Sequence, residues 1–243
     1  YAELTHSTGG HSYFVPQEVY GTQGNPRCSD AELTTAAHVA HARGADGIYL
    51  FNFVYYRRLG PEVDIPITEP PFHLLPRLAD PQALARQRQH YTVAESHYWR
   101  QVPRDLAPGE PTTLVFDLAL TPRETLQASL RAAERMRALD GTNPARTGYA
   151  DPASIYQARL RLHFLQPMQE RALKVCVNGQ PVEPTENVSR IYGNPFDGMI
   201  SPRENRKAFV VARSLLHDGE NAVEVTLESG EPVKLIYADL AVE

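Results

Sequence analysis

Apolar and polar positions alternate with a period of two along the C-terminal part of the chain, from about residue 105 onward. In each run apolar side chains take every second position, which is typical of a half-buried β-strand. The turn-forming pairs Asn178-Gly179 and Asp218-Gly219 mark tight turns next to such runs. Antiparallel strands joined by turns of this kind predict a β-sandwich. The predicted strands are 113–120, 157–165, 173–177, 223–227 and 232–242.

The N-terminal part follows a different pattern, in which a helix leads into an apolar strand. Ser29 and Glu32 form a capping-box motif at the start of a predicted helix over 29–44. The run 47–54 is apolar at odd and even positions, which predicts a strand buried on both faces, as in parallel sheets covered by helices. Residues 1–5 predict another short strand.

Two further helices and a linker are predicted. Asp80-Pro81 combines an N-cap with a proline at the first helical position, and this helix is expected to reach about His90. A similar motif at 121–124 begins a helix over about 122–140, which would interrupt the sandwich as an insertion. Segment 93–106 is expected to be the linker.

Charge and composition exclude several kinds of partner. The formal net charge is -5 and the pI is about 6.0, so the chain has no basic excess with which to bind a nucleic acid. No apolar run reaches the roughly 18 residues that a membrane helix needs, so no membrane contact is expected. Cys28 and Cys176 fit neither a disulfide framework nor a metal-ligand spacing, and we expect no metal and no cofactor.

The stretch 31–53, with its Gly-Ala-Asp-Gly-Ile-Tyr-Leu-Phe-Asn-Phe run, resembles the last α/β unit of glycoside-hydrolase-like TIM barrels of bacteria. The stretch 78–91 resembles the helix that closes such barrels. This resemblance implies the last units of a (β/α)8 barrel in 1–92, with 1–5 as strand seven and the 47–54 run as strand eight. A jelly-roll-like antiparallel β-sandwich would follow in 107–243.

The resemblance also implies that six barrel units come from elsewhere. Two strands cannot close a barrel, and their edges would be exposed. We therefore expect the missing units from a longer parent chain or from another polypeptide. Because the sequence starts at Tyr1 without a Met, we expect a C-terminal piece of a longer protein, with a processed mature chain as the alternative. The sequence does not determine the cellular compartment, and a periplasmic or secreted location is compatible with it.

A carbohydrate substrate and two catalytic carboxylates are implied by the same resemblance. Active sites of barrels lie at the carboxyl ends of the strands. Glu3 on strand seven is the candidate nucleophile, and His6 in the next loop could bind a sugar hydroxyl. Glu18 and Tyr20 in that loop are candidate substrate contacts. The alternative is that these carboxylates are structural or solvated.

Strand eight adds two candidate substrate-binding residues. Asn52 stands at its carboxyl end, where it either faces the site or bonds the local backbone. Tyr55 follows the strand and could stack on a sugar ring. Elsewhere, His38 and His41 are spaced three apart on the predicted helix, which we interpret as solvated histidines rather than metal ligands.

Two functions are consistent with these features. The first is the C-terminal portion of a glycoside-hydrolase-like protein that acts on glycosidic bonds. Because the chain holds at most one of the two barrel carboxylates, we predict no glycosidase activity for this chain alone. The alternative is a non-catalytic carbohydrate-binding or structural module built around the sandwich.

Overall fold

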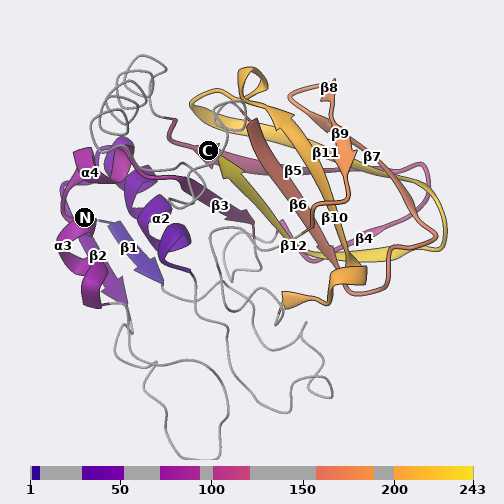
Figure 1. Cartoon of the computed structure of the whole chain (residues 1–243), viewed down its shortest axis with the longest axis horizontal. Coiled ribbons are helices and arrows are strands. Elements are labelled where there is room, and N and C mark those ends of the chain that lie inside the picture. The colour runs from indigo at the N-terminus through magenta and orange to yellow at the C-terminus, as the bar shows by residue number, and fades with distance from the viewer. Residues whose placement is uncertain are drawn as a thin grey trace, which may run out of the picture.

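The computed structural model describes residues 2–5, 29–51, 72–93, 101–120, 157–188 and 200–242. These residues form an α/β unit at the N-terminal side and a larger two-sheet β-sandwich (Figure 1). None of the helices among them is long and apolar enough to span a membrane.

The α/β unit contains two parallel strands with a helix between them in sequence. β1 (Ala2–Thr5) pairs in parallel with β2 (Ile48–Phe51), and α2 (Asp30–Ala42) connects the two. Short helices η1 (Phe72–Leu74), α3 (Leu75–Leu78) and α4 (Pro81–Ala85) follow. The predicted strands at 1–5 and 47–54 are therefore adjacent and parallel, while the complete barrel stays a prediction.

The sequence explains where α2 begins and ends. Ser29 Oγ accepts the Glu32 N–H at 3.2 Å, and the Glu32 carboxylate accepts the Ser29 N–H at 2.5 Å, so the predicted capping box is confirmed. After the helix, Gly44 has a φ of 93°, a conformation that glycine adopts at little cost. The buried face of α2 joins a small core with these residues: Leu33, Ala37, Ile48, Leu50, Leu74, Leu78 and Leu84.

Two predictions about this part of the chain are wrong. The strand expected to be buried on both faces has Tyr49 57% exposed, because the described helices cover only the face that carries Ile48 and Leu50. The helix expected to reach His90 ends at Ala85, and Gln89–Val93 forms strand β3. This segment has a partner in the last strand of the sandwich, and pairing in a sheet overrides a weak helical preference.

The sandwich consists of two antiparallel sheets, in agreement with the predicted architecture. The six-stranded sheet has the order β3-β12-β6-β10-β9, and β4 also pairs with β12. The remaining bounds in this sheet are β4 (Arg104–Leu106), β6 (Gln157–Phe164), β9 (Glu183–Thr185), β10 (Arg206–Ala212) and β12 (Val233–Val242). The four-stranded sheet, in the order β5-β11-β7-β8, comprises β5 (Pro111–Leu118), β7 (Ala172–Val177), β8 (Gln180–Pro181) and β11 (Gly219–Ser229). Short helices η4 (Arg203–Asn205) and η5 (Arg213–Leu215) flank β10.

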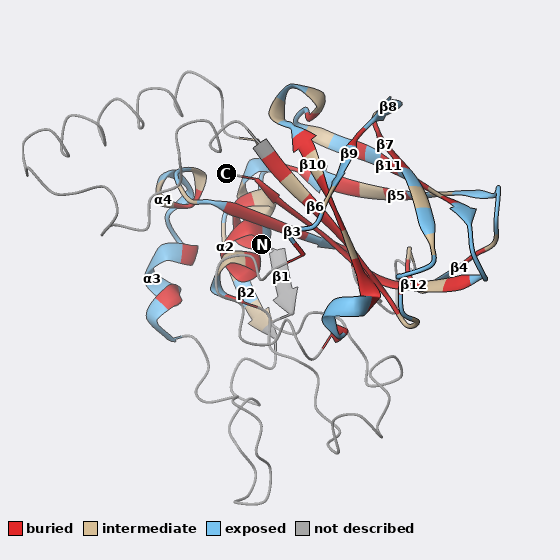
Figure 2. Cartoon of the chain, turned by 45° about the vertical axis from the view of Figure 1, so that its right-hand side comes forward, coloured by how far each residue is buried: buried red, intermediate tan, exposed pale blue. Residues whose placement is uncertain are grey.

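The core between the sheets is built from the alternating apolar positions that the sequence predicts. β5 contributes Leu114, Phe116 and Leu118, and the facing sheet contributes residues such as Leu160 and Leu162. Figure 2 shows buried positions in red along strands such as β3 and β6. All five predicted strands are present, as β5, β6, β7, β11 and β12. The helical insertion predicted over about 122–140 lies outside the described residues.

Several strands escape the sequence analysis. β4 falls inside the segment predicted as a linker, and β10 was not predicted at all. β10 has buried residues on both faces, so its sequence lacks the period-two signal. The burial of its second face shows that the six-stranded sheet is covered on both sides at this strand.

Candidate functional site

The residues predicted to form a carbohydrate site belong to the α/β unit. Glu3 occupies the position of β1 that pairs with Tyr49 of β2. The two strands end in register, at Thr5 and Phe51. The other predicted contacts, His6, Glu18, Tyr20, Asn52 and Tyr55, lie outside the described residues.

A second polar region lies on the outer face of the six-stranded sheet, on the side away from the sandwich core. Arg161 and His163 of β6 and Asp239 of β12 are each 0% exposed, and His90 of β3 is also buried. These side chains alternate along their strands with the core residues, so they point to the opposite face. We call this group, together with Glu32 and Tyr237, the buried polar cluster.

Asp239 is at the centre of the buried polar cluster. Arg161 donates to it through Nη2 at 2.6 Å from Oδ2 and through Nε at 3.0 Å from Oδ1, so the pair is bidentate. His90 Nε2 and His163 Nε2 each lie 3.6 Å from one of its oxygens, an ion-pair distance rather than a hydrogen bond. Burial alone would raise the pKa of Asp239, but the Arg161 charge and the two histidines hold it well below its usual range.

Tyr237 connects the cluster to helix α2. Its hydroxyl donates to Glu32 Oε1 at 2.8 Å, and the other oxygen of Glu32 belongs to the capping box. Both carboxylate oxygens therefore have partners although Glu32 is buried. Burial and the nearby carboxylates of Glu32 and Asp239 raise the pKa of Tyr237 well above its ordinary value, so its hydroxyl remains a donor.

The order Ser201, His163, Asp239 invites comparison with a nucleophilic triad, but its geometry is unsuited to that chemistry. His163 Nδ1 lies 2.9 Å from Ser201 Oγ, whereas its other nitrogen is 3.6 Å from Asp239. All three residues are buried, and Arg161 already neutralises the carboxylate. A nucleophile must be reached by its substrate, so this arrangement serves packing rather than acyl transfer.

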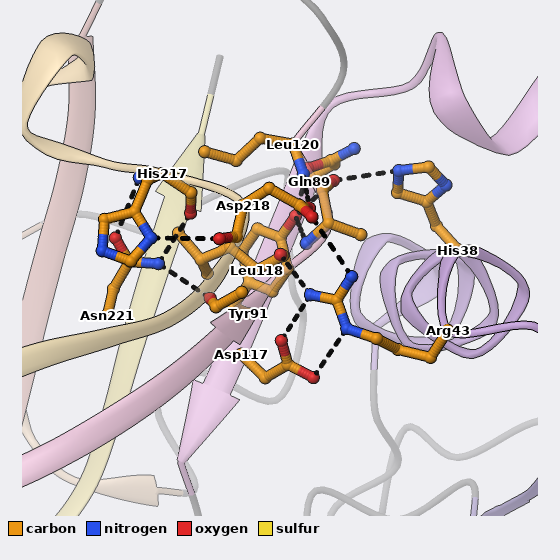
Figure 3. A network of polar contacts seen from close by, with 12 residues as sticks. His38, Arg43, Gln89, Tyr91, Asp117, Leu118, Leu120, His217, Asp218 and Asn221 are labelled. Carbon is orange, nitrogen blue, oxygen red and sulfur yellow. Dashed lines mark hydrogen bonds and ion pairs between the residues drawn. The ribbon is translucent and has the colours of Figure 1, made fainter.

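A further set of polar contacts joins the end of α2 to the other sheet (Figure 3). Arg43 Nη2 lies 2.5 Å from Asp117 Oδ1 and donates to the Leu118 carbonyl at 2.7 Å, and Arg43 Nη1 lies 3.4 Å from Asp218. His38 Nε2 is 2.9 Å from the Ala119 carbonyl oxygen. We call the contacts between α2 and the sandwich, including those of the buried polar cluster, the α2 joint.

The two helix histidines were expected to be solvated, and this is wrong. His38 is buried beside the Ala119 carbonyl that follows β5, and burial lowers its pKa. His41 bonds the carbonyl oxygens of Ala45 at 2.8 Å and Leu78 at 2.9 Å. Their spacing therefore serves two different packing contacts. In the part of the chain that the structure describes, no group of His, Cys, Asp and Glu side chains is arranged to hold a metal ion.

A cavity of about 400 Å³ lies beside the α2 joint. It is lined by Glu32 and Thr35 of α2, by His90 of β3, and by Val115 of β5. Gln101 borders it and pairs with the Val115 backbone, accepting the N–H at 2.5 Å and donating to the carbonyl at 2.9 Å. The cavity thus reaches the cluster from the open side of the sandwich, between the edge strands β3 and β5.

Sequence reasoning did not find the buried polar cluster. Arg161 and His163 occupy the polar positions of a period-two strand, which look the same whether they face water or a covering helix. The usable signal was Asp239, an isolated acid within the largely apolar β12. A carboxylate in such a run needs a cationic partner when it is buried.

Comparisons with known proteins give only distant likenesses. No protein family matches the chain, and no curated protein sequence matches it. Among solved structures, a β-porphyranase of glycoside hydrolase family 86 from the human gut bacterium Bacteroides plebeius has a TM-score of 0.34 and 16% identity, over 64% of this chain and 20% of that chain. BuGH86 in complex with neoagarooctaose has a TM-score of 0.33 and 11% identity, over 64% of this chain and 18% of that one. Similarity at this level does not establish a shared fold or activity.

Proposed function

We propose that this chain is the C-terminal portion of a glycoside-hydrolase-like protein and that carbohydrate binds at the carboxyl ends of β1 and β2. The observation that carries the proposal is the parallel register in which Thr5 lies opposite Phe51. Functional residues of α/β folds gather at the carboxyl ends of parallel strands. The chain continues from these two paired ends with His6 and Asn52, which are the polar residues proposed to contact the sugar.

The proposed nucleophile is Glu3. Its position in β1 pairs with Tyr49, and Tyr49 belongs to the strand face that the described helices leave exposed. A retaining glycosidase needs a second carboxyl group about 5 Å away as acid/base. In this proposal that group belongs to the missing barrel units, and Glu18, Tyr20 and Tyr55 complete the sugar contacts from this chain.

The test compares the chain with its parent protein on a panel of glycosides. We expect hydrolysis by the parent protein, loss of hydrolysis in Glu3→Gln, and unchanged hydrolysis in Glu183→Gln, which alters an exposed carboxylate on β9. We expect none from the chain alone. Full activity of the parent protein carrying Glu3→Gln would show that Glu3 is not the nucleophile. Hydrolysis by the isolated chain would contradict the proposal that the second carboxyl group lies in the other barrel units.

A second candidate function is a structural module, and the α2 joint supports it. The sandwich holds α2 through both of its sheets, by way of Tyr237 on one and Asp117 on the other. Among the described positions of β5, β7 and β11, the exposed outer face carries no aromatic side chain on which a sugar could stack. These positions include Thr113, Asp117, Lys174, Glu220, Ala222 and Glu224.

Titration of the chain with soluble polysaccharides separates the two functions. Binding that weakens on Asn52→Ala or Tyr55→Ala would support a sugar site on the α/β unit. Binding that is insensitive to both changes and to Glu3→Gln would favour a carbohydrate-binding sandwich. Absence of binding, together with an active parent protein, would assign the sandwich a supporting role.

A further inference from the structure

Two histidines approach the same buried carboxylate from opposite sides. Strand β12 lies between β3 and β6, so Asp239 has His90 on one neighbouring strand and His163 on the other. Each histidine places Nε2 3.6 Å from a different oxygen of Asp239. Similar distance and burial would suggest similar protonation, but their other neighbours differ.

The charges around His90 favour its protonated form. Asp239 of β12 and Glu32 of α2 are both acidic, and Arg161 of β6 is the cation that faces it. These three charges sum to minus one, so an imidazolium at His90 balances them. Tyr237 is also nearby but stays neutral because its pKa is raised by burial.

The charges around His163 favour its neutral form. Asp239 faces it from β12, while Arg161 from β6 and Arg206 from β10 add two positive charges. These sum to plus one before His163 is counted. A neutral ring also suits its contacts, which are Ser201 Oγ at 2.9 Å and the edge-on ring of Tyr237 at a centroid distance of 5.0 Å.

We propose that the α2 joint is a proton-dependent latch, in which protonated His90 pairs with the carboxylate of Asp239 and offsets the nearby charge of Glu32, while His163 stays neutral. His90 also donates its backbone N–H to Thr35 Oγ1 of α2 at 2.8 Å, so the same residue joins helix and sheet twice. When His90 loses its proton, the negative charges of Glu32 on α2 and Asp239 on β12 are offset only in part by Arg161. The joint then loosens from its β3 side.

The cavity beside the joint adjoins His90. It is lined by both His90 and Glu32, and its volume of about 400 Å³ exceeds the roughly 30 Å³ that one water molecule occupies. His163 does not line this cavity. The residue that the latch requires to titrate is therefore the one next to the open space.

The direction of the pH dependence follows from the two histidines. Burial opposes protonation of His90, but the charges of Asp239 and Glu32 outweigh it and raise its pKa above the ordinary 6.5. Burial and the two arginines lower the pKa of His163 below 6.5, in spite of Asp239. The His90 contribution is complete below pH 6.5 and is lost as the pH rises through its raised pKa. The His163 contribution is complete above pH 6.5 and is lost as the pH falls through its lowered pKa.

Urea unfolding of the full chain at a series of pH values tests the latch. We expect stability to be greatest near pH 6.5 and the unfolding constant to rise on both sides, by at most about tenfold per pH unit for each histidine. His90→Gln should flatten the alkaline limb alone. His163→Gln should reduce the acid limb alone, and part of that limb should remain because burial lowers the pKa of His38 as well. An alkaline limb that survives in His90→Gln would overturn the proposal.

Two measurements on the unaltered chain keep the test decisive if a variant does not fold. NMR titration of the imidazole carbons should give His90 a pKa above 6.5 and His163 a pKa below it; equal or reversed values would refute the latch. The protection factor of the His90 amide against hydrogen exchange should fall above pH 6.5. The protection factors of amides in the β5–β11 ladder should stay constant over the same pH range. An equal fall in both places would mean global loosening rather than a latch.

Discussion

The hydroxyl of Tyr237 donates a 2.8 Å hydrogen bond to Glu32 across 205 positions of sequence. It links the last strand of the sandwich to the first turn of α2, where Glu32 also closes the capping box. One carboxylate therefore fixes the start of the helix and its place on the sheet. This double use makes the α2 joint sensitive to single-atom changes.

Tyr237→Phe tests the value of that contact. The change removes one hydroxyl and leaves a buried oxygen of Glu32 without its donor, so we expect the free energy of unfolding to fall by about 1–3 kcal/mol. Tyr49→Phe, which removes the same atom from an exposed ring, should change it by less than about 0.5 kcal/mol. Urea unfolding of both variants measures the difference, and equal losses would contradict it.

Arg161→Met tests the buried ion pair. It leaves the fully buried Asp239 carboxylate without its bidentate partner, so we expect a loss of about 3–5 kcal/mol. The matched control is Asp105→Asn in the Lys234–Asp105 pair, whose side chains are 34% and 81% exposed. That exposed pair should contribute about 0–1 kcal/mol. A small loss in Arg161→Met would show that the histidines replace the arginine.

Acid should destabilise the fold through Asp239. Because its pKa is held well below the ordinary 3.8, its stabilising contribution is complete above pH 3.8 and is lost as the pH falls through the lowered value. Thermal unfolding between about pH 2 and 5 should show this loss, and Asp239→Asn should reduce the pH dependence while lowering stability throughout.

Arg43 should contribute a smaller, salt-dependent stabilisation. Its pairs with Asp117 and Asp218 are largely exposed, so we expect Arg43→Ala to lower stability by no more than about 1 kcal/mol at low salt. Screening at about 1 M salt should remove most of that effect. The cost of Arg161→Met should stay nearly constant over the same salt range, because water and ions are excluded from the buried pair. If the loss of stability in Arg43→Ala does not depend on salt, packing of the aliphatic part of the Arg43 side chain would account for it.

The sequence predicted elements whose causes are local. The capping box of Ser29 and Glu32 gave the start of α2, and the Asn178-Gly179 pair gave the turn after β7, where both residues have positive φ. Alternation identified β5, β6 and β11 because one face of each strand packs in a single core.

Elements decided by distant partners were missed or misread. Residues 89–93 form a strand because they pair with one edge of β12, and no local sequence pattern predicts that pairing. Arg161 and His163 occupy the polar positions of a strand predicted as half-buried, and alternation reports only that two faces differ, not what covers the second one. The predicted sugar site could be followed no further than Glu3, since its other residues fall outside the described ranges.

Gln101 has a consequence for the behaviour of the chain at high concentration. β5 is an edge strand of its sheet, and an exposed edge strand can pair with strands from other molecules. The Gln101 amide occupies the donor and acceptor of Val115 as a neighbouring peptide group would. A second molecule must displace that side chain before it can pair with β5 at Val115, so Gln101 opposes extension of the sheet at this position.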